Sequence, residues 1–304
     1  MKTAYEQIIN TDHIASSSNM QNLSEIISWG EQENLTPASQ DKRKVLLLAI
    51  DVQNDFMEGI GSLPVQGSKG DVERLTRWIY RNVGKITQII CSLDTHSISQ
   101  IFHPDWWVDK DGNKPLSFTV ITYADVLSGK WSAANGKNEL SLDYLKNLEL
   151  TGKKQLCIWP YHCLCGTRGA ELENEFSKML YFHSAARKSA PVLSTKGQNP
   201  FTEMYGIIKA EYDPDNYINR PVLEAVEHFD EIYIAGEASS HCVLASTFQI
   251  LDYFAENKDI TSRITVLSDC MSPIGGFEEV TEKSFEEMKS RYGIQIKKST
   301  DVVL

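Results

Sequence analysis

The stretch EIYIAGEASSHC, residues 231–242, decides the fold of this chain. Its apolar first half stops at Gly236, as is typical of a buried strand. A turn of small residues then leads to Cys242, and the apolar spacing of the following VLASTFQILDYF predicts a helix. Strand, turn and helix in this order place Cys242 at the carboxyl end of a strand, where open α/β sheets bind their ligands.

This position makes Cys242 a candidate nucleophile. A thiol at the start of a helix lies near the positive end of the helix dipole and near unpaired amide groups, and both favour the thiolate. A free cysteine is also commonly a small buried residue that packs the start of a helix. Cys242 alone does not distinguish these two roles, so the ends of the other strands must be considered.

Strands and helices alternate through residues 44–304. Apolar runs predict strands at 44–51, 86–94, 153–160, 190–197, 231–237 and 263–269. Periodic apolar spacing predicts helices at 71–83, 169–180, 243–254 and 280–292. Such alternation is typical of parallel βαβ units. We therefore expect an α/β fold, a three-layer α/β/α sandwich with a mostly parallel central sheet.

Two segments fall outside this alternation. Residues 1–43 form a polar N-terminal leader, in which NLSEIISW predicts one short helix that packs on the surface or against a partner chain. Residues 102–152 interrupt the domain 44–304 as an inserted segment, irregular or locally helical, over the rim of the sheet. A connection of that length is usually functional or part of an interface.

Composition narrows the class of partner. The chain has 304 residues, of which 41% are hydrophobic, and a net charge of −11, which argues against nucleic acid or anionic lipid as a partner. No segment is typical of a membrane span, and the N-terminus lacks the apolar core of a signal peptide. The six cysteines are not spaced as a disulfide framework. We expect a cytoplasmic protein that acts on a small molecule and forms a homo-oligomer.

Polar residues stand at the carboxyl ends of five predicted strands, so one edge of the sheet should gather them. They are Asp51, Asp94 with His96, His162, Lys196 and Cys242. Each alone has an ordinary structural explanation, such as a capping aspartate or a solvated loop lysine. Together they supply acid, base and nucleophile candidates on one edge, which indicates an active site.

These residues carry a resemblance to a known family. The chain resembles the isochorismatase-like cysteine hydrolases and, within them, the nicotinamidases, from about residue 45 to residue 296. The motifs are DVQNDF at 51–56, LDTH at 93–96, WPYHC at 159–163 with GT and GAEL after it, Lys196-Gly197, and the run from Gly236 to Cys242. All five occur in the order typical of the family.

The resemblance implies a catalytic triad of Asp51, Lys196 and Cys242. Cys242 would attack the carbonyl of a carboxamide to form a thioester, with Asp51 as the general base. In the family a cis peptide precedes the position of Ala238. Its N–H group, together with that of Cys242, would then form the oxyanion hole, a type of donor pair that lowers the barrier by about 3–4 kcal/mol.

The resemblance also implies one divalent metal ion bound by Asp94, His96 and His162. One carboxylate and two imidazoles suit zinc best, with iron or manganese as alternatives. His103 is either a further residue of the metal shell or a surface histidine of the inserted segment. In the family the metal binds the pyridine nitrogen of the substrate.

Three aromatic residues are candidates for the substrate-binding wall. Phe56 and Trp159 stand beside the triad and metal motifs, and Tyr205 follows Lys196 in a segment that differs from the usual family pattern. Phe56 and Trp159 are equally well explained as core aromatics. Because the inserted segment and the residues after Lys196 border the pocket, the identity of the amide stays open.

Nicotinamide hydrolysis is the leading interpretation, and the alternatives come from two classes. Another C–N hydrolase of the superfamily would act on a ureido, carbamoyl or different amide compound. Isochorismatase activity is disfavoured, because that reaction needs neither the cysteine nor the metal set. A non-catalytic ligand-binding protein is disfavoured because it would not need to keep Asp51, Lys196 and Cys242.

Overall fold

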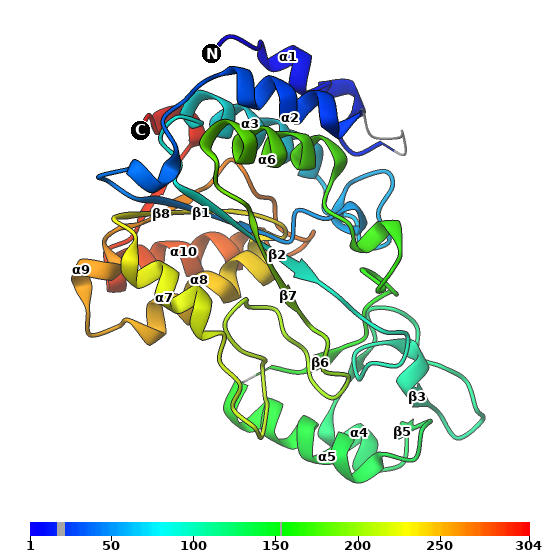
Figure 1. The fold of residues 1–304 in the computed structure, drawn as a ribbon. Coiled ribbons are helices and arrows are strands. Elements are labelled where there is room, and N and C mark those ends of the chain that lie inside the picture. The colour runs from blue at the N-terminus through cyan, green and yellow to red at the C-terminus, as the bar shows by residue number, and fades with distance from the viewer. Residues whose placement is uncertain (17–21, 153) are drawn as a thin grey trace.

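A six-stranded sheet organises the computed structural model, which describes residues 1–16, 22–152 and 154–304 (Figure 1). Every pair of neighbouring strands is parallel. The strand order is β10-β9-β8-β1-β2-β7. The bounds are β1 Val45–Ile50, β2 Gln88–Asp94, β7 Val192–Lys196, β8 Glu231–Gly236, β9 Ile264–Leu267 and β10 Gln295–Lys297. The predicted α/β fold with a parallel central sheet is confirmed.

Helices cover both faces of this sheet, because each face is apolar. Alternate residues of β1 enter two different clusters: Leu47 and Ala49 pack with one core, and Leu46 and Leu48 with the other. In Figure 1 one face carries α1 Tyr5–Ile8, α2 Leu23–Gln32, α3 Ser68–Asn82 and α6 Asn174–Arg187. The other face carries α7 Arg220–His228, α8 Leu244–Tyr253 and α10 Glu278–Tyr292. A short helix, α9 Lys258–Thr261, precedes β9.

The prediction of a sheet strand at 153–160 is wrong. Only β6 Leu156–Cys157 is extended there, and it pairs antiparallel with β4 Val120–Ile121 of the inserted segment. Residue 153 lies outside the described residues. The main sheet has no place for this strand, because β7 pairs directly with β2. An apolar run indicates a strand but not its partner. The short strand β10 was not predicted, because its three residues form no apolar run.

The inserted segment folds around its own aromatic residues beyond the ends of β2 and β7 (Figure 1). It contains β3 Trp107–Val108, β5 Ser132–Ala133, α4 Tyr123–Leu127 and α5 Asn138–Asn147. Trp106 donates a hydrogen bond to Ser141 Oγ at 2.9 Å, which ties the start of the segment to α5. The segment is therefore ordered around buried indoles as well as locally helical.

The described residues among the first 43, 1–16 and 22–43, include helices that pack on the layer of α3 and α6. The predicted helix is present as α2, which lies against α6 at Gly30: a Cβ there would come 2.7 Å from Phe182 O. Tyr5 and Ile26 are buried in the same core as the sheet. Within the described parts of the chain, no helix is both long enough and apolar enough to cross a membrane.

Candidate active site

Four neighbouring strands deliver the predicted triad and one metal residue to the same edge. Cys242 follows β8, Asp51 follows β1, Asp94 ends β2 and Lys196 ends β7. These strands stand in the order β8-β1-β2-β7. Because all are parallel, their carboxyl ends lie on one side of the sheet, and the four side chains meet there. Asp51 and Cys242 are nevertheless 191 positions apart in the sequence.

Lys196 is the centre of this group. Its Nζ lies 2.9 Å from Asp51 Oδ2, 2.8 Å from Asp94 Oδ1 and 3.7 Å from Cys242 Sγ. Burial acts to lower the pKa of Lys196, but the two carboxylates outweigh it and raise that pKa well above the usual value. One donor atom each of Asp51, Asp94 and Cys242 lies within 4.8 Å of the other two, and the ammonium of Lys196 already supplies their cation.

Asp51 has the contacts expected of a base that takes up a proton. Ser92 Oγ donates to Asp51 Oδ1 at 2.5 Å, and both residues are fully buried. Burial raises the pKa of Asp51 above the usual aspartate value, while Lys196 works in the opposite direction. Ser92 was not predicted, because a serine inside the apolar strand gives no signal until the partner strand is known.

Burial works against the thiolate that the start of a helix favours at Cys242. Cys242 lies in a π-helical turn, Ser239–Val243, directly before α8, and is 5% exposed. Burial raises the pKa of the Cys242 thiol well above its usual value, and Lys196 opposes this only in part. A thiol with a raised pKa needs a neighbouring base to become a nucleophile, and Asp51 is the candidate for that role.

The turn that carries Ala238 begins as the resemblance implied. The peptide bond between Glu237 and Ala238 is cis. Before it, Gly236 has φ of +124°, and a Cβ at this position would lie 1.9 Å from Ile50 O. Only glycine therefore fits between β8 and β1 at the point where the turn begins.

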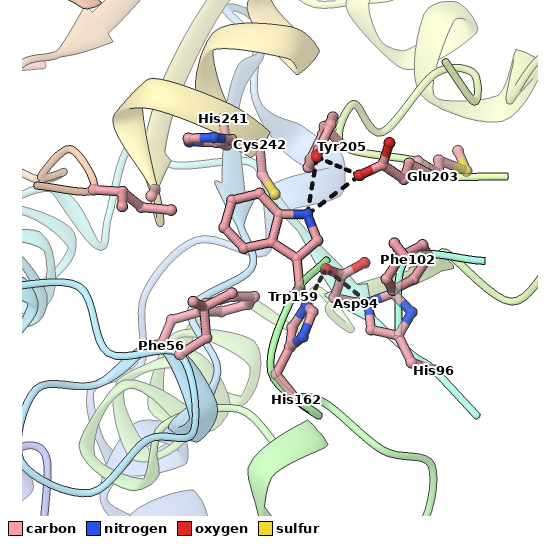
Figure 2. A pocket seen from close by; sticks show the side chains of 14 residues that line it. Phe56, Asp94, His96, Phe102, Trp159, His162, Glu203, Tyr205, His241 and Cys242 are labelled. Atoms are coloured by element: carbon pink, nitrogen blue, oxygen red, sulfur yellow. Dashed lines mark hydrogen bonds and ion pairs between the residues drawn. The ribbon is translucent and has the colours of Figure 1, made fainter. Parts of the chain in front are cut away.

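The metal-ligand candidates come together as a second group beside Lys196. Donor atoms of Asp94, His96 and His162 lie within 4.8 Å of one another, and all three residues are buried. His96 Nε2 is 3.1 Å and His162 Nε2 is 3.8 Å from Asp94 Oδ2 (Figure 2). Burial acts to raise the pKa of Asp94, but His96, Lys196 and His162 together hold it well below the usual range.

Both histidines present the same nitrogen to this group. His96 Nδ1 bonds to Gly197 O at 3.0 Å, and His162 Nδ1 bonds to Pro160 O at 2.7 Å. A carbonyl accepts only, so each Nδ1 carries a hydrogen and each Nε2 is the nitrogen that faces Asp94. Burial, and then His96, lower the pKa of His162 to about 3, so its imidazole is neutral at physiological pH. Two imidazole nitrogens and a carboxylate suit a divalent metal ion.

His103 follows the same pattern at the edge of the group. Its Nδ1 bonds to Ser97 O at 3.0 Å, and its buried Nε2 has no hydrogen-bond partner. Its ring centre lies 5.8 Å from that of His96 and 5.7 Å from that of His162. His103 stands outside the set whose donor atoms all fall within 4.8 Å, so it borders the group rather than completing it.

Residues within the recognised motifs hold the ligands in place. Gln53 donates to Asp94 O at 2.8 Å and accepts from Asp94 N at 2.7 Å. Asp55 accepts from Cys163 N at 2.6 Å and so fixes the loop of His162. Gly197 has φ of +73°, and a Cβ there would lie 2.5 Å from His96 Cε1. The sequence motifs thus contain supporting residues that had not been singled out.

A single cavity joins the two groups. The predicted wall residues Phe56, Trp159 and Tyr205 all line it, together with Cys242 and Asp94 (Figure 2). Residues not predicted also line it: Leu63, Phe102, Glu203, Met204, His241 and Ile274. Glu203 accepts hydrogen bonds from Trp159 Nε1 at 3.2 Å and from Tyr205 Oη at 2.5 Å, so the wall is braced from the segment after Lys196.

Comparisons with known proteins agree with this geometry. No family model matches the chain. A curated nicotinamidase from Saccharomyces cerevisiae is 22% identical over 245 residues, which are 80% of this chain and 95% of that protein. The crystal structure of the yeast nicotinamidase bound to the inhibitor nicotinaldehyde aligns with a TM-score of 0.59 at 21% identity, covering 84% of this chain and 99% of that one.

A second solved structure gives the same result. A nicotinamidase and pyrazinamidase from Acinetobacter baumanii aligns with a TM-score of 0.58 at 18% identity, covering 87% of this chain and 100% of that one. The predicted resemblance to nicotinamidases is confirmed, and the chain has the fold of these proteins over nearly their full length.

Proposed function

We propose that this chain is a metal-dependent amidohydrolase, a nicotinamidase that converts nicotinamide and water to nicotinate and ammonia. One observation carries the proposal: a single cavity is lined by both Cys242, which Lys196 joins to Asp51, and the metal-ligand candidates Asp94, His96 and His162. A cavity that served binding alone would not need a buried nucleophile with its base. The curated relative is a nicotinamidase, which favours this amide.

The chain's own residues supply the steps of hydrolysis. Asp51 takes the thiol proton, and Cys242 Sγ attacks the amide carbon. The N–H groups of Ala238 and Cys242 would stabilise the oxyanion. When the C–N bond breaks, Asp51 returns the proton to the departing nitrogen and a thioester remains. Water then loses a proton to Asp51 and adds to the thioester, the C–S bond breaks, and Asp51 returns that proton to the departing sulfur of Cys242 as nicotinate is released.

Lys196 links the charges of these steps. Its ammonium lies within 2.9 Å of Asp51 and 3.7 Å of Cys242 Sγ, so it stabilises the carboxylate before proton transfer and the thiolate during it. Because all three groups are buried, these interactions are stronger than in water. The proton moves over a short path and the cation need not move.

The residues beside Lys196 fit a divalent metal ion, with zinc as the proposed ion. Asp94, His96 and His162 would hold it, because their donor atoms converge and a carbonyl fixes the Nδ1 of each histidine. When bound, the metal would supply an electrophilic anchor for the ring nitrogen of the substrate. All six cysteines are free, which supports a reducing, cytoplasmic location.

Ammonia release from a panel of amides tests the proposal, with the metal content measured on the same preparation. The panel contains nicotinamide, pyrazinamide, benzamide, and ureido and carbamoyl compounds. We expect nicotinamide to exceed benzamide by about 10⁴-fold in kcat/KM, because a site built for a polar anchor rejects an analogue that lacks it. Comparable rates for these two amides would refute the metal-anchored model. Activity confined to ureido or carbamoyl compounds would assign the other hydrolase class, and no turnover would favour a binding protein.

A further inference from the structure

Two buried carboxyl groups outside the pocket lie behind the turn that carries Cys242. Asp71, in the first turn of α3, is 2% exposed, and Glu237, directly after β8, is 1% exposed. Neither takes part in the proposed hydrolysis. A buried carboxylate is costly unless it is paired, so two of them in one place need a physical explanation.

The positive charge near these two acids does not neutralise two carboxylates. Arg74 lies 2.7 Å from Asp71 Oδ1, and its side chain is 44% exposed. Among the described residues, Glu237 makes no ion pair; its Oε2 receives a long bond of 3.5 Å from Ser272 N. The remaining oxygens, Asp71 Oδ2 and Glu237 Oε1, are buried without a conventional donor.

The two acids satisfy each other if one of them carries a proton. Both side chains lie beside Ser272: its N–H is 3.5 Å from Glu237 Oε2, and its Oγ and Asp71 Oδ2 both lie within 4 Å of the Cβ position at Gly67. The two carboxyl groups interact with each other there. Two carboxylates only repel, whereas a carboxyl group donates to a carboxylate. Burial, and then the charge of Asp71, raise the pKa of Glu237 well above its usual value, and burial raises the pKa of Asp71.

This pair joins α3 to the turn. Glu237 immediately precedes Ala238, and the next residue, Ser239, donates from its N–H to Ser272 O at 2.8 Å. Ser240 Oγ accepts from Ile274 N at 3.0 Å, and Ile274 lines the pocket. A displacement of Glu237 would therefore move both the turn and the opposite wall.

We propose that Asp71 and Glu237 share one buried proton, and that this pair is a positioning element that holds the turn of Ala238 and Cys242 against α3. The positioning role rests on the proposed function, because it assumes that Cys242 and Ala238 act in hydrolysis. The shared proton is independent of it. The pair touches neither the substrate cavity nor the metal-ligand candidates.

The shared proton is tested by the pH dependence of unfolding in wild type and Glu237→Gln. A carboxyl group with a raised pKa in the folded state stabilises the protein below its unfolded pKa, and this stabilisation is lost as the pH rises toward the folded value. We expect urea unfolding of the wild type to lose stability relative to Glu237→Gln as the pH rises above about 4.5. Parallel curves would overturn the shared proton. The charged neighbours are Arg74 of α3 and Asp269, which accepts from Ser299 N at 2.6 Å.

The positioning role is tested by comparing Glu237→Ala with Glu237→Gln. Without the pair the turn is released, and we expect kcat to fall about 10- to 100-fold in Glu237→Ala with little change in KM, since small misplacements of reacting groups cost about 10²-fold. Glutamine keeps a donor for Asp71, so Glu237→Gln should restore most of the rate. It should also lack any loss of kcat that the wild type shows when the shared proton dissociates at alkaline pH. Equal losses in both variants, or none in Glu237→Ala, would overturn the role.

A matched control and a second readout separate this proposal from the proposed function. Glu173 is also buried, with a pKa that burial raises to about 7, but it caps α6 far from the turn. Glu173→Gln should alter the pH dependence of unfolding and leave the kcat profile unchanged. Alkylation of Cys242 by iodoacetamide, followed by mass spectrometry, needs no substrate: a changed rate in Glu237→Ala and a restored one in Glu237→Gln support positioning even if nicotinamide is not hydrolysed. Unchanged rates in both variants would contradict it.

Discussion

Asp51 and Asp94 end neighbouring strands and contact the same lysine, yet the protein treats them in opposite ways. Burial raises the pKa of Asp51, and the opposing effects of Lys196 and Ser92 are not large enough to cancel this. Asp94 has Lys196, His96 and His162 around it, and its pKa is held low although it too is buried. The number of positive or potentially positive neighbours therefore separates the pKa values of the two carboxyl groups, as the proposed base and the proposed metal ligand require.

The largest expected effect comes from removing the nucleophile beside Asp51 while leaving the residues around Asp94 intact. Cys242→Ala should lower kcat by about 10⁴- to 10⁶-fold, because the thioester cannot form and only binding and the oxyanion hole remain. The metal content should stay at the wild-type level, since Asp94, His96 and His162 are untouched. Ammonia release and metal analysis check both statements. Cys165→Ala, at an exposed cysteine, is the control and should keep wild-type activity.

The next largest effect comes from removing a candidate metal ligand beside Asp94 while leaving Asp51 and Cys242 intact. His162→Ala removes a candidate ligand, and we expect metal affinity to fall by more than the roughly 10- to 100-fold typical of second-shell changes. Iodoacetamide should still label Cys242 in the metal-free variant, because Lys196 and Asp51 remain beside it. Competition with a chelator measures the affinity. His228→Ala, at an exposed histidine, should bind metal as the wild type does; full occupancy in His162→Ala would remove its ligand role.

A smaller effect sharpens the Asp51 side. Ser92→Ala removes the 2.5 Å hydrogen bond to Asp51, which works to lower the pKa of that carboxyl group. The pKa of Asp51 should rise further, so the acid limb of kcat/KM should shift to higher pH, since the base must be ionised to act. At neutral pH we expect a loss of about 10-fold or less. Ser177→Ala, at a buried serine of α6, should leave the profile in place; an unshifted limb in Ser92→Ala would contradict the base role of Asp51.

The smallest effect sharpens the Asp94 side. Gln53 holds the main chain of Asp94 through two hydrogen bonds and does not touch its carboxylate. Gln53→Met keeps the volume but leaves Asp94 N and O unpaired, at a cost of about 1–3 kcal/mol in stability for an unsatisfied buried group. Metal affinity should fall by about 10-fold, the low end for outer-shell changes. Chelator competition and urea unfolding measure the two effects, and a loss as large as that of His162→Ala would mean that Gln53 is itself a ligand.

Local patterns predicted much of the sheet and of the site. The runs that became β1, β2, β8 and β9 were recognised because buried parallel strands are apolar on both faces. The edge strand β7 is largely exposed, and only the apolar residues at its start indicated it. The strand predicted at 153–160 failed, because its apolar residues pair with the inserted segment instead of the sheet. Glu203 and His241 were missed in the pocket wall, since a polar residue in a loop carries no local sign of which cavity it lines.

The sequence by itself determined which residue types stand at the strand ends, because the strand-to-loop boundary is a local property of hydrophobic pattern and turn residues. Only the tertiary structure decided that Lys196 separates two carboxylates, that Ser92 bonds to Asp51, and that burial raises the pKa of Cys242. A pKa depends on desolvation and on charges within a few ångströms. Those neighbours come from four different strands, and only folding brings them together.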